Sequence, residues 1–132
     1  MTLVYLDSSA LVKLVVAEPE SSVLANFLRG WSERVSSAVA LTEVPRALRR
    51  AGFGASERRR SREVMARIAL VDVDRRILVA AAALDPPALR TLDAIHLATA
   101  LAVREDLAAI VTYDRRLAAA AERAHLEVSV PR

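Results

Sequence analysis

Residues 2–11 read TLVYLDSSAL, an apolar run of strand length that ends at Asp7, Ser8 and Ser9. Asp and Ser side chains accept hydrogen bonds from the free amide groups of a first helical turn, so these three residues predict the start of a helix. The opening of the chain therefore predicts a strand that leads directly into a helix.

The alternation of strand and helix continues along the chain. Further short strands are predicted at 34–36, 69–73 and 109–112, and a possible fifth at 127–130. They lack a two-residue period, which predicts burial on both faces. We therefore expect one α/β domain over residues 1–132, a three-layer α/β/α fold with a central parallel sheet of four to five short strands.

Helical patterns fill the segments between these runs. Capping chemistry predicts that Ser36 or Ser37, Asp74 and Thr91 each cap the helix that follows. The expected helices cover residues 10–16, 20–31, from 36 or 37 to about 51, 56–68, 75–84, 92–104 and 115–124.

Composition limits the possible chemistry. The chain contains no cysteine, which excludes a disulfide framework, a thiolate zinc site and a cysteine nucleophile. Its net charge of +3 is a weak indication of anionic partners. No signal peptide or membrane-spanning run is visible in the sequence, so a cytoplasmic protein without membrane contact is expected.

Four acidic residues fall where the functional site of an open parallel sheet is expected, outside the carboxyl ends of the strands. Asp7 and Asp114 follow strands, Asp93 lies in the first turn of a long helix, and Glu43 lies in the helix after the second strand. Each also has a purely structural explanation. The first two can cap helices, Asp93 can face a helix dipole, and Glu43 can pair with Arg46.

The sequence around these acids resembles a known family. The strings 7–11 (DSSAL), 41–44 (LTEV), 92–100 (LDAIHLATA) and 111–117 (VTYDRRL) resemble the four motifs of PIN domains, in the family's order. They span nearly the whole chain. The short length resembles that of the VapC-type toxin ribonucleases of type II toxin–antitoxin systems.

The resemblance implies a function and a site. Asp7, Glu43, Asp93 and Asp114 would hold one or two Mg²⁺ or Mn²⁺ ions and cleave RNA endonucleolytically. It further implies a homodimer and a VapB-like antitoxin, through which alone the protein would contact DNA. Clustered carboxylates repel one another, and hard oxygen ligands suit these ions, which activate water for attack on phosphorus.

The resemblance also gives supporting roles. Ser9 and Thr112 fit positions where the family often has a small hydroxyl residue that orients the acids or a water. Arg46, Arg49 and Arg50 begin a dense basic stretch that extends to Arg62, which is either a phosphate-binding rim or a solvated helix face.

Two further features leave alternatives open. His96, three residues after Asp93, is interpreted as a packed helix histidine, with contact to Asp93 or to a metal-bound water as the alternative. An apolar set in the first two helices predicts a groove for a partner segment, unless these side chains all pack inward. The set is Leu11, Leu14, Val15, Val23 and Phe27.

Other functions fit the sequence less well. A phosphoacceptor receiver domain needs an acid pair after the first strand, and an aspartyl phosphatase needs a second Asp where Ser9 stands. A PIN-fold RNA-processing nuclease, or an inactive RNA- or protein-binding module, is the alternative to a toxin.

Overall fold

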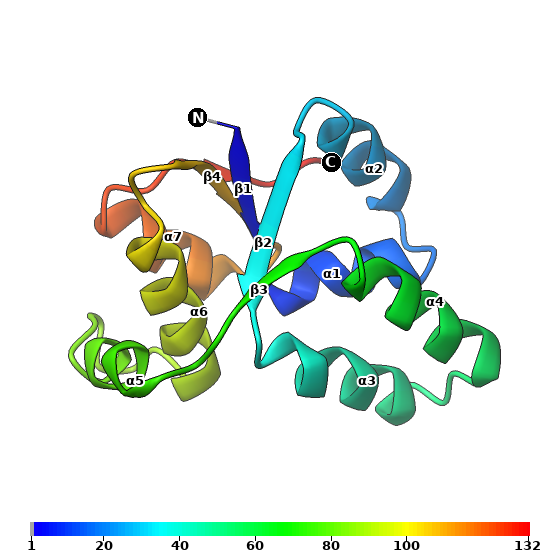
Figure 1. Cartoon of the computed structure of the whole chain (residues 1–132), viewed down its shortest axis with the longest axis horizontal. Helices are drawn as coiled ribbons and strands as arrows, with labels where there is room; N and C mark the ends of the chain where they lie inside the picture. The colour runs from blue at the N-terminus through cyan, green and yellow to red at the C-terminus, as the bar shows by residue number, and fades with distance from the viewer. Residues whose placement is uncertain (1) are drawn as a thin grey trace.

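The computed structural model describes residues 2–132 (Figure 1). Within this range the chain forms five parallel strands in the order β3-β2-β1-β4-β5. The expected α/β/α fold with a parallel sheet is confirmed, including its short last strand. The strands are β1 (Leu3–Leu6), β2 (Glu33–Ser37), β3 (Ala69–Val71), β4 (Leu107–Val111) and β5 (Val128–Ser129).

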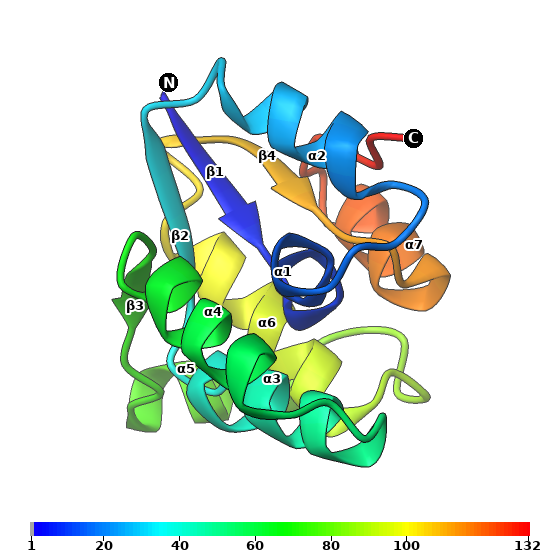
Figure 2. The ribbon, with the colours of Figure 1, turned by 90° about the vertical axis from the view of Figure 1, so that its right-hand side faces the viewer.

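Helices cover both faces of the sheet, with α1 to α4 on one side and α5 to α7 on the other (Figures 1 and 2). The helices are α1 (Ser8–Val15), α2 (Ser21–Leu28), α3 (Ala40–Arg50), α4 (Ala55–Met65), α5 (Arg75–Ala82), α6 (Thr91–Ala102) and α7 (Arg115–Arg123). Among residues 2–132, no helix combines the length and the hydropathy that crossing a membrane requires.

Strand β1 divides the core into two layers. Val4 and Leu6 face α1 to α4, whereas Tyr5 packs with Leu97 of α6 and Leu117 of α7. All three β1 side chains are completely buried, as the continuous apolar run predicts for a central parallel strand. The parallel register places the carboxyl ends of β1, β2 and β4 at one edge of the sheet.

Several helix ends differ from the prediction. Ser36 and Ser37 are the last residues of β2, and α3 begins only at Ala40. Thr91 is the first residue of α6, one position after its N-cap Arg90. Strand pairing extends β2 over both serines, and Ser37 Oγ accepts from the amide of Val39, the residue just before α3. Asp74 does cap α5, through a hydrogen bond from the Ile77 amide.

Helix α2 ends at Leu28 rather than at residue 31. The amides of Arg29, Gly30 and Trp31 each bond to a carbonyl three residues back, so the chain continues in tighter turns. The apolar pattern extends through these turns, which explains why the sequence predicts a longer helix.

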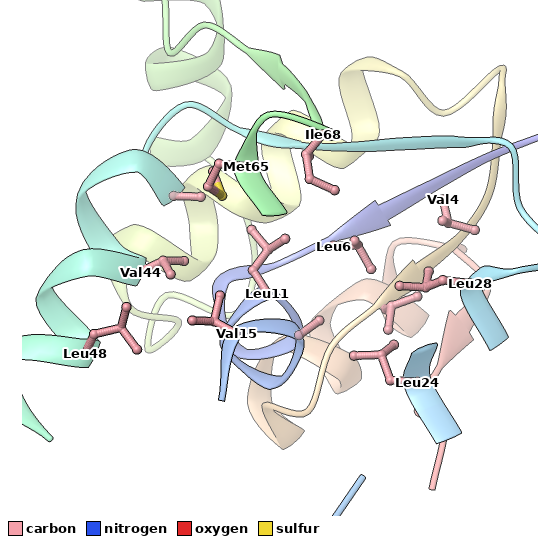
Figure 3. Packing of buried hydrophobic residues seen from close by; sticks show 13 residues of the cluster. Val4, Leu6, Leu11, Val15, Leu24, Leu28, Val44, Leu48, Met65 and Ile68 are labelled. Atoms are coloured by element: carbon pink, nitrogen blue, oxygen red, sulfur yellow. The ribbon is translucent and has the colours of Figure 1, made fainter. Parts of the chain in front are cut away.

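The expected apolar groove on the first two helices is not present as such. Leu11 and Val15 are buried in the core, and Leu14 and Phe27 pack against it; only Val23 is well exposed, at 40%. Figure 3 shows Leu11 and Val15 among the side chains of this core. The reason is that α1 contacts α2, α3 and α4 and is enclosed by them.

Candidate active site

A cleft of about 840 Å³ lies at the carboxyl edge of the sheet. All four expected acids line it: Asp7, Glu43, Asp93 and Asp114. Asp7 and Asp114 are the N-caps of α1 and α7, and Glu43 and Asp93 lie in the first turns of α3 and α6. Helices α1, α3 and α7 follow strands, whereas α6 follows α5. The fold thus brings together acids that are distant in the sequence.

Asp7 is the most buried of the four acids, with 3% of its surface exposed. It caps α1 by accepting from the Ala10 amide at 3.0 Å. Its carboxylate also accepts from the Ser9 hydroxyl at 2.7 Å and the Thr112 hydroxyl at 2.6 Å. Burial raises the pKa of Asp7, and these hydrogen bonds oppose that rise. Capping therefore uses the same carboxylate that faces the cleft.

The two hydroxyl residues join the segments that follow β1 and β4. Ser9 Oγ donates to Asp7 and accepts from the Tyr113 amide at 2.9 Å. Thr112 Oγ1 donates to Asp7 and accepts from the Asp114 amide at 3.1 Å. Both hydroxyls therefore link the Asp7 carboxylate to the backbone of the segment after β4.

Asp93 and Asp114 are bridged by a residue that the sequence analysis did not single out. Arg90 donates from Nε to Asp93 at 3.2 Å and from a terminal nitrogen to Asp114 at 2.9 Å. Burial and the charge of Asp114 raise the pKa of Asp93 against the effect of Arg90. The signal in the sequence was the spacing, since Arg90 stands three residues before Asp93 next to a helix start.

Asp114 also caps α7. Its Oδ1 accepts from the amides of Arg116 and Leu117 at 2.9 and 3.1 Å, which leaves Oδ2 for Arg90. Like Asp7, it combines the structural role with a position in the cleft.

Glu43 reaches the cleft from α3. Its Oε1 accepts from Ser8 Oγ at 2.6 Å and lies 2.7 Å from His96 Nε2. Burial raises the pKa of Glu43, but the hydrogen bonds from His96 and Ser8 outweigh it and leave the pKa below its usual value. Within residues 2–132, Glu43 forms no ion pair with Arg46; its partner is the imidazole.

His96 is 1% exposed, which confirms its interpretation as a packed helix histidine. Its Nδ1 lies 2.7 Å from the Tyr5 hydroxyl, and the two rings meet edge to face. It contacts Glu43 rather than Asp93, the partner considered from the sequence. Helical spacing suggested the wrong acid because the contact crosses from α6 to α3.

The chemistry of the donors fits Mg²⁺ or Mn²⁺, since four carboxylates offer hard oxygen ligands around one cleft. In the positions they occupy, no three Asp, Glu or His side chains of residues 2–132 stand close enough together to hold a metal ion. The reason is visible in their contacts. Arg90 holds Asp93 and Asp114, and hydrogen bonds from the protein hold Asp7 and Glu43.

The arginine-rich stretch divides into two groups. Arg46 and Arg50 line the cleft with Glu43, at helical spacings of three and four residues along α3, whereas Arg49 does not line it. Arg60 of α4 bonds to the Leu14 carbonyl and lines a separate pocket. Only part of the stretch therefore lies beside the acids.

Comparison with known proteins gives a consistent result. The family model described as "PIN domain" matches residues 4–123. Ribonuclease VapC46 of Mycobacterium tuberculosis (strain ATCC 25618 / H37Rv) is 49% identical over 131 residues, which cover 99% of both chains. Ribonuclease VapC35 of the same strain is 43% identical, over 98% of this chain and 97% of the relative.

Solved structures share the fold at lower identity. A toxin–antitoxin complex from Klebsiella pneumoniae has a TM-score of 0.74 at 21% identity, covering 98% of each chain. VapBC2 from Rickettsia felis, bound to a DNA fragment from its promoter, has a TM-score of 0.75 at 14% identity, covering 96% of this chain and 97% of the other. The chain belongs to the PIN-domain family and, within it, to the VapC type.

Proposed function

We propose that this protein is a metal-dependent endoribonuclease that acts as the toxin of a VapBC-type pair. The observation that carries the proposal is the meeting of Asp7, Glu43, Asp93 and Asp114 in one cleft, from four separate segments. The relatives at up to 49% identity, named ribonuclease VapC, support the activity on RNA. The structural neighbours described as toxin–antitoxin complexes support the pairing with a VapB-like antitoxin.

The four carboxylates are proposed to hold one or two Mg²⁺ or Mn²⁺ ions. A bound ion would supply Lewis-acid activation of water and of the scissile phosphate. Ser9 and Thr112 fix the Asp7 carboxylate through bonds of 2.7 and 2.6 Å. Because these hydroxyls also bond to the segment after β4, they keep Asp7 and Asp114 in a fixed relation.

Arg90 has a place in this proposal. Its single positive charge offsets part of the negative charge of Asp93 and Asp114, and its side chain is 65% exposed. Asp93 and Asp114 are among the residues that would hold an ion. If they did so, the Arg90 guanidinium would remain beside the cleft, where it could pair with a phosphate of the RNA backbone.

Partners beyond RNA follow from the same proposal. We expect a homodimer, and α5 leaves Leu78 and Val79 exposed, at 49% and 66%, on a surface where a second copy can dock. DNA is contacted only through the antitoxin, and the protein acts in the cytoplasm, where its substrate is.

Metal removal tests the mechanism. Cleavage of a structured RNA should stop when EDTA is added and return when Mg²⁺ or Mn²⁺ is supplied in excess. Asp7→Asn protein, purified in parallel, controls for a contaminating nuclease. Cleavage by the wild type that persists through EDTA treatment and dialysis would exclude a metal-dependent mechanism.

The cleft arginines give a second prediction. Arg46→Ala and Arg50→Ala should each raise KM about fivefold, equivalent to about 1 kcal/mol of binding free energy, with kcat little changed. Each should also lower the salt dependence of binding by about one phosphate contact. Arg49→Ala is the matched control, since Arg49 lies on the same helix and does not line the cleft. Equal effects of all three would assign them a general electrostatic role.

A further inference from the structure

Glu43 is held at one of its two oxygens. The hydrogen bonds from Ser8 and His96, at 2.6 and 2.7 Å, both reach Oε1. Glu43 also lines the cleft, so this arrangement leaves Oε2 for a ligand there. A glutamate has three rotatable side-chain bonds, and a carboxylate that is to bind a ligand needs them fixed.

The side chain that fixes Glu43 is itself fixed. His96 is 1% exposed and Tyr5 is fully buried, so neither ring is free to turn toward solvent. The imidazole bonds at both ends, to the Tyr5 hydroxyl through Nδ1 and to Glu43 through Nε2. Nε2 also lies 3.2 Å from Ser8 Oγ, whose own proton is donated to Glu43. Tyr5 lies in the central strand, which makes it a rigid anchor for the ring.

The chemistry of the two neighbours orients the ring. The Glu43 carboxylate is ionised and accepts only, so the nitrogen that faces it must carry a proton. A tyrosine hydroxyl carries one proton, which Tyr5 can donate to Nδ1 at 2.7 Å. Nε2 is therefore the protonated nitrogen, and it donates to Glu43.

We propose that His96 is a positioning residue for the ribonuclease reaction: anchored by Tyr5, it holds Glu43 Oε1 and thereby aims Oε2 into the cleft. This inference rests on the proposed function, because the proposed function assigns Glu43 the role of a metal ligand in the cleft. The alternative is that His96 is only a core residue that satisfies the Tyr5 hydroxyl. Both explanations need the ring, but they need different nitrogens of it.

Two amide substitutions separate these explanations. The glutamine amide in His96→Gln reaches the position of Nε2 and can donate to Glu43. The amide in His96→Asn reaches only the position of Nδ1 and can bond to Tyr5. Far-ultraviolet circular dichroism and thermal melting establish that each variant is folded.

For a positioning role, His96→Gln should keep kcat within about threefold of the wild type, and His96→Asn should lose about 10- to 100-fold, the usual effect of removing a partner of a metal-binding side chain. Calorimetric titration with Mn²⁺ alone should give a Kd for His96→Gln that is close to the wild-type value and a higher Kd for His96→Asn. If His96→Asn matches the wild type while His96→Gln does not, or if the two are equal, His96 does not position Glu43.

A spectroscopic measurement tests the orientation without any activity. Long-range ¹H–¹⁵N spectra of the metal-free full chain should show Nε2 of His96 protonated, with His96→Gln identifying its signals against those of His125. A proton on Nδ1 alone would overturn the proposal. Absence of RNA cleavage by the wild type would instead count against the proposed function, and the Mn²⁺ titrations and spectra would still decide the role of His96.

Discussion

Replacement of Asp7 by asparagine is expected to lower kcat/KM for RNA cleavage by about 10³-fold or more, the scale of several kcal/mol of lost metal-ion stabilisation. Asparagine has nearly the shape of aspartate and keeps an acceptor for the Ser9 hydroxyl and the Ala10 amide. Its amide nitrogen takes the place of the oxygen that accepts from Thr112, and it can donate to that hydroxyl instead. It lacks the negative charge that a ligand of Mg²⁺ or Mn²⁺ supplies. The loss should therefore be one of chemistry and not of structure.

The same substitution should raise the melting temperature of the metal-free protein. The folded-state pKa of Asp7 is raised by burial, so the ionised carboxylate destabilises the fold at neutral pH. This penalty shrinks as the pH falls through the folded-state pKa, and asparagine removes it at every pH. We expect a gain of about 3–6 °C at pH 7 in EDTA, which corresponds to about 1 kcal/mol in a domain of this size.

Asp72→Asn is the matched control, because Asp72 is exposed and does not line the cleft. It should change neither the cleavage rate nor the melting temperature appreciably. Asp7→Asn protein that cleaves RNA at the full rate with saturating metal would show that Asp7 does not bind the ion.

Induction of the wild-type chain in bacteria is expected to arrest growth, and induction of Asp93→Asn is not. Asp93 is half-buried beside Asp114, and asparagine removes its charge without changing its volume. Growth curves and viable counts after induction measure the effect, with immunoblots to show equal amounts of soluble protein. Co-expression of the proposed VapB-like antitoxin should restore growth of the cells that express the wild-type chain.

Two outcomes would count against the toxin role. Equal arrest by the wild type and Asp93→Asn would show that the toxicity is not catalytic. Normal growth with soluble wild-type protein that cleaves RNA in vitro would favour a processing nuclease of the same fold.

The acids could be found from the sequence because each lies in a short local pattern. Asp7 and Asp114 follow apolar runs and cap helices, and parallel strands bring such positions to one edge. Arg46 and Arg50 line the cleft and Arg49 does not. This difference could also have been predicted, because it follows from the helical period. Local spacing was sufficient wherever the relevant partner lay in the same element.

Contacts between distant elements were not accessible in this way. Helical spacing offered Asp93 only as an alternative partner of His96, whereas the contact between α6 and α3 gives it Glu43. Hydrophobicity marked Leu11 and Val15 as candidates for a groove, because the sequence does not state that three helices enclose α1. Side-chain partners of this kind are set by tertiary packing, which composition and periodicity leave open.

The interior position of β4 has a consequence for how the protein is made. β4 lies beside β1 in the sheet, and Thr112 just after it bonds to Asp7 from 105 residues along the chain. A nascent chain on the ribosome thus lacks both Asp114 and the hydroxyl that holds Asp7 until synthesis has passed most of its length. The proposed catalytic set can close only after that point. A growing or prematurely terminated chain therefore lacks the complete set of proposed catalytic acids. By the proposed mechanism, it cannot cleave the RNAs of the ribosome that is translating it.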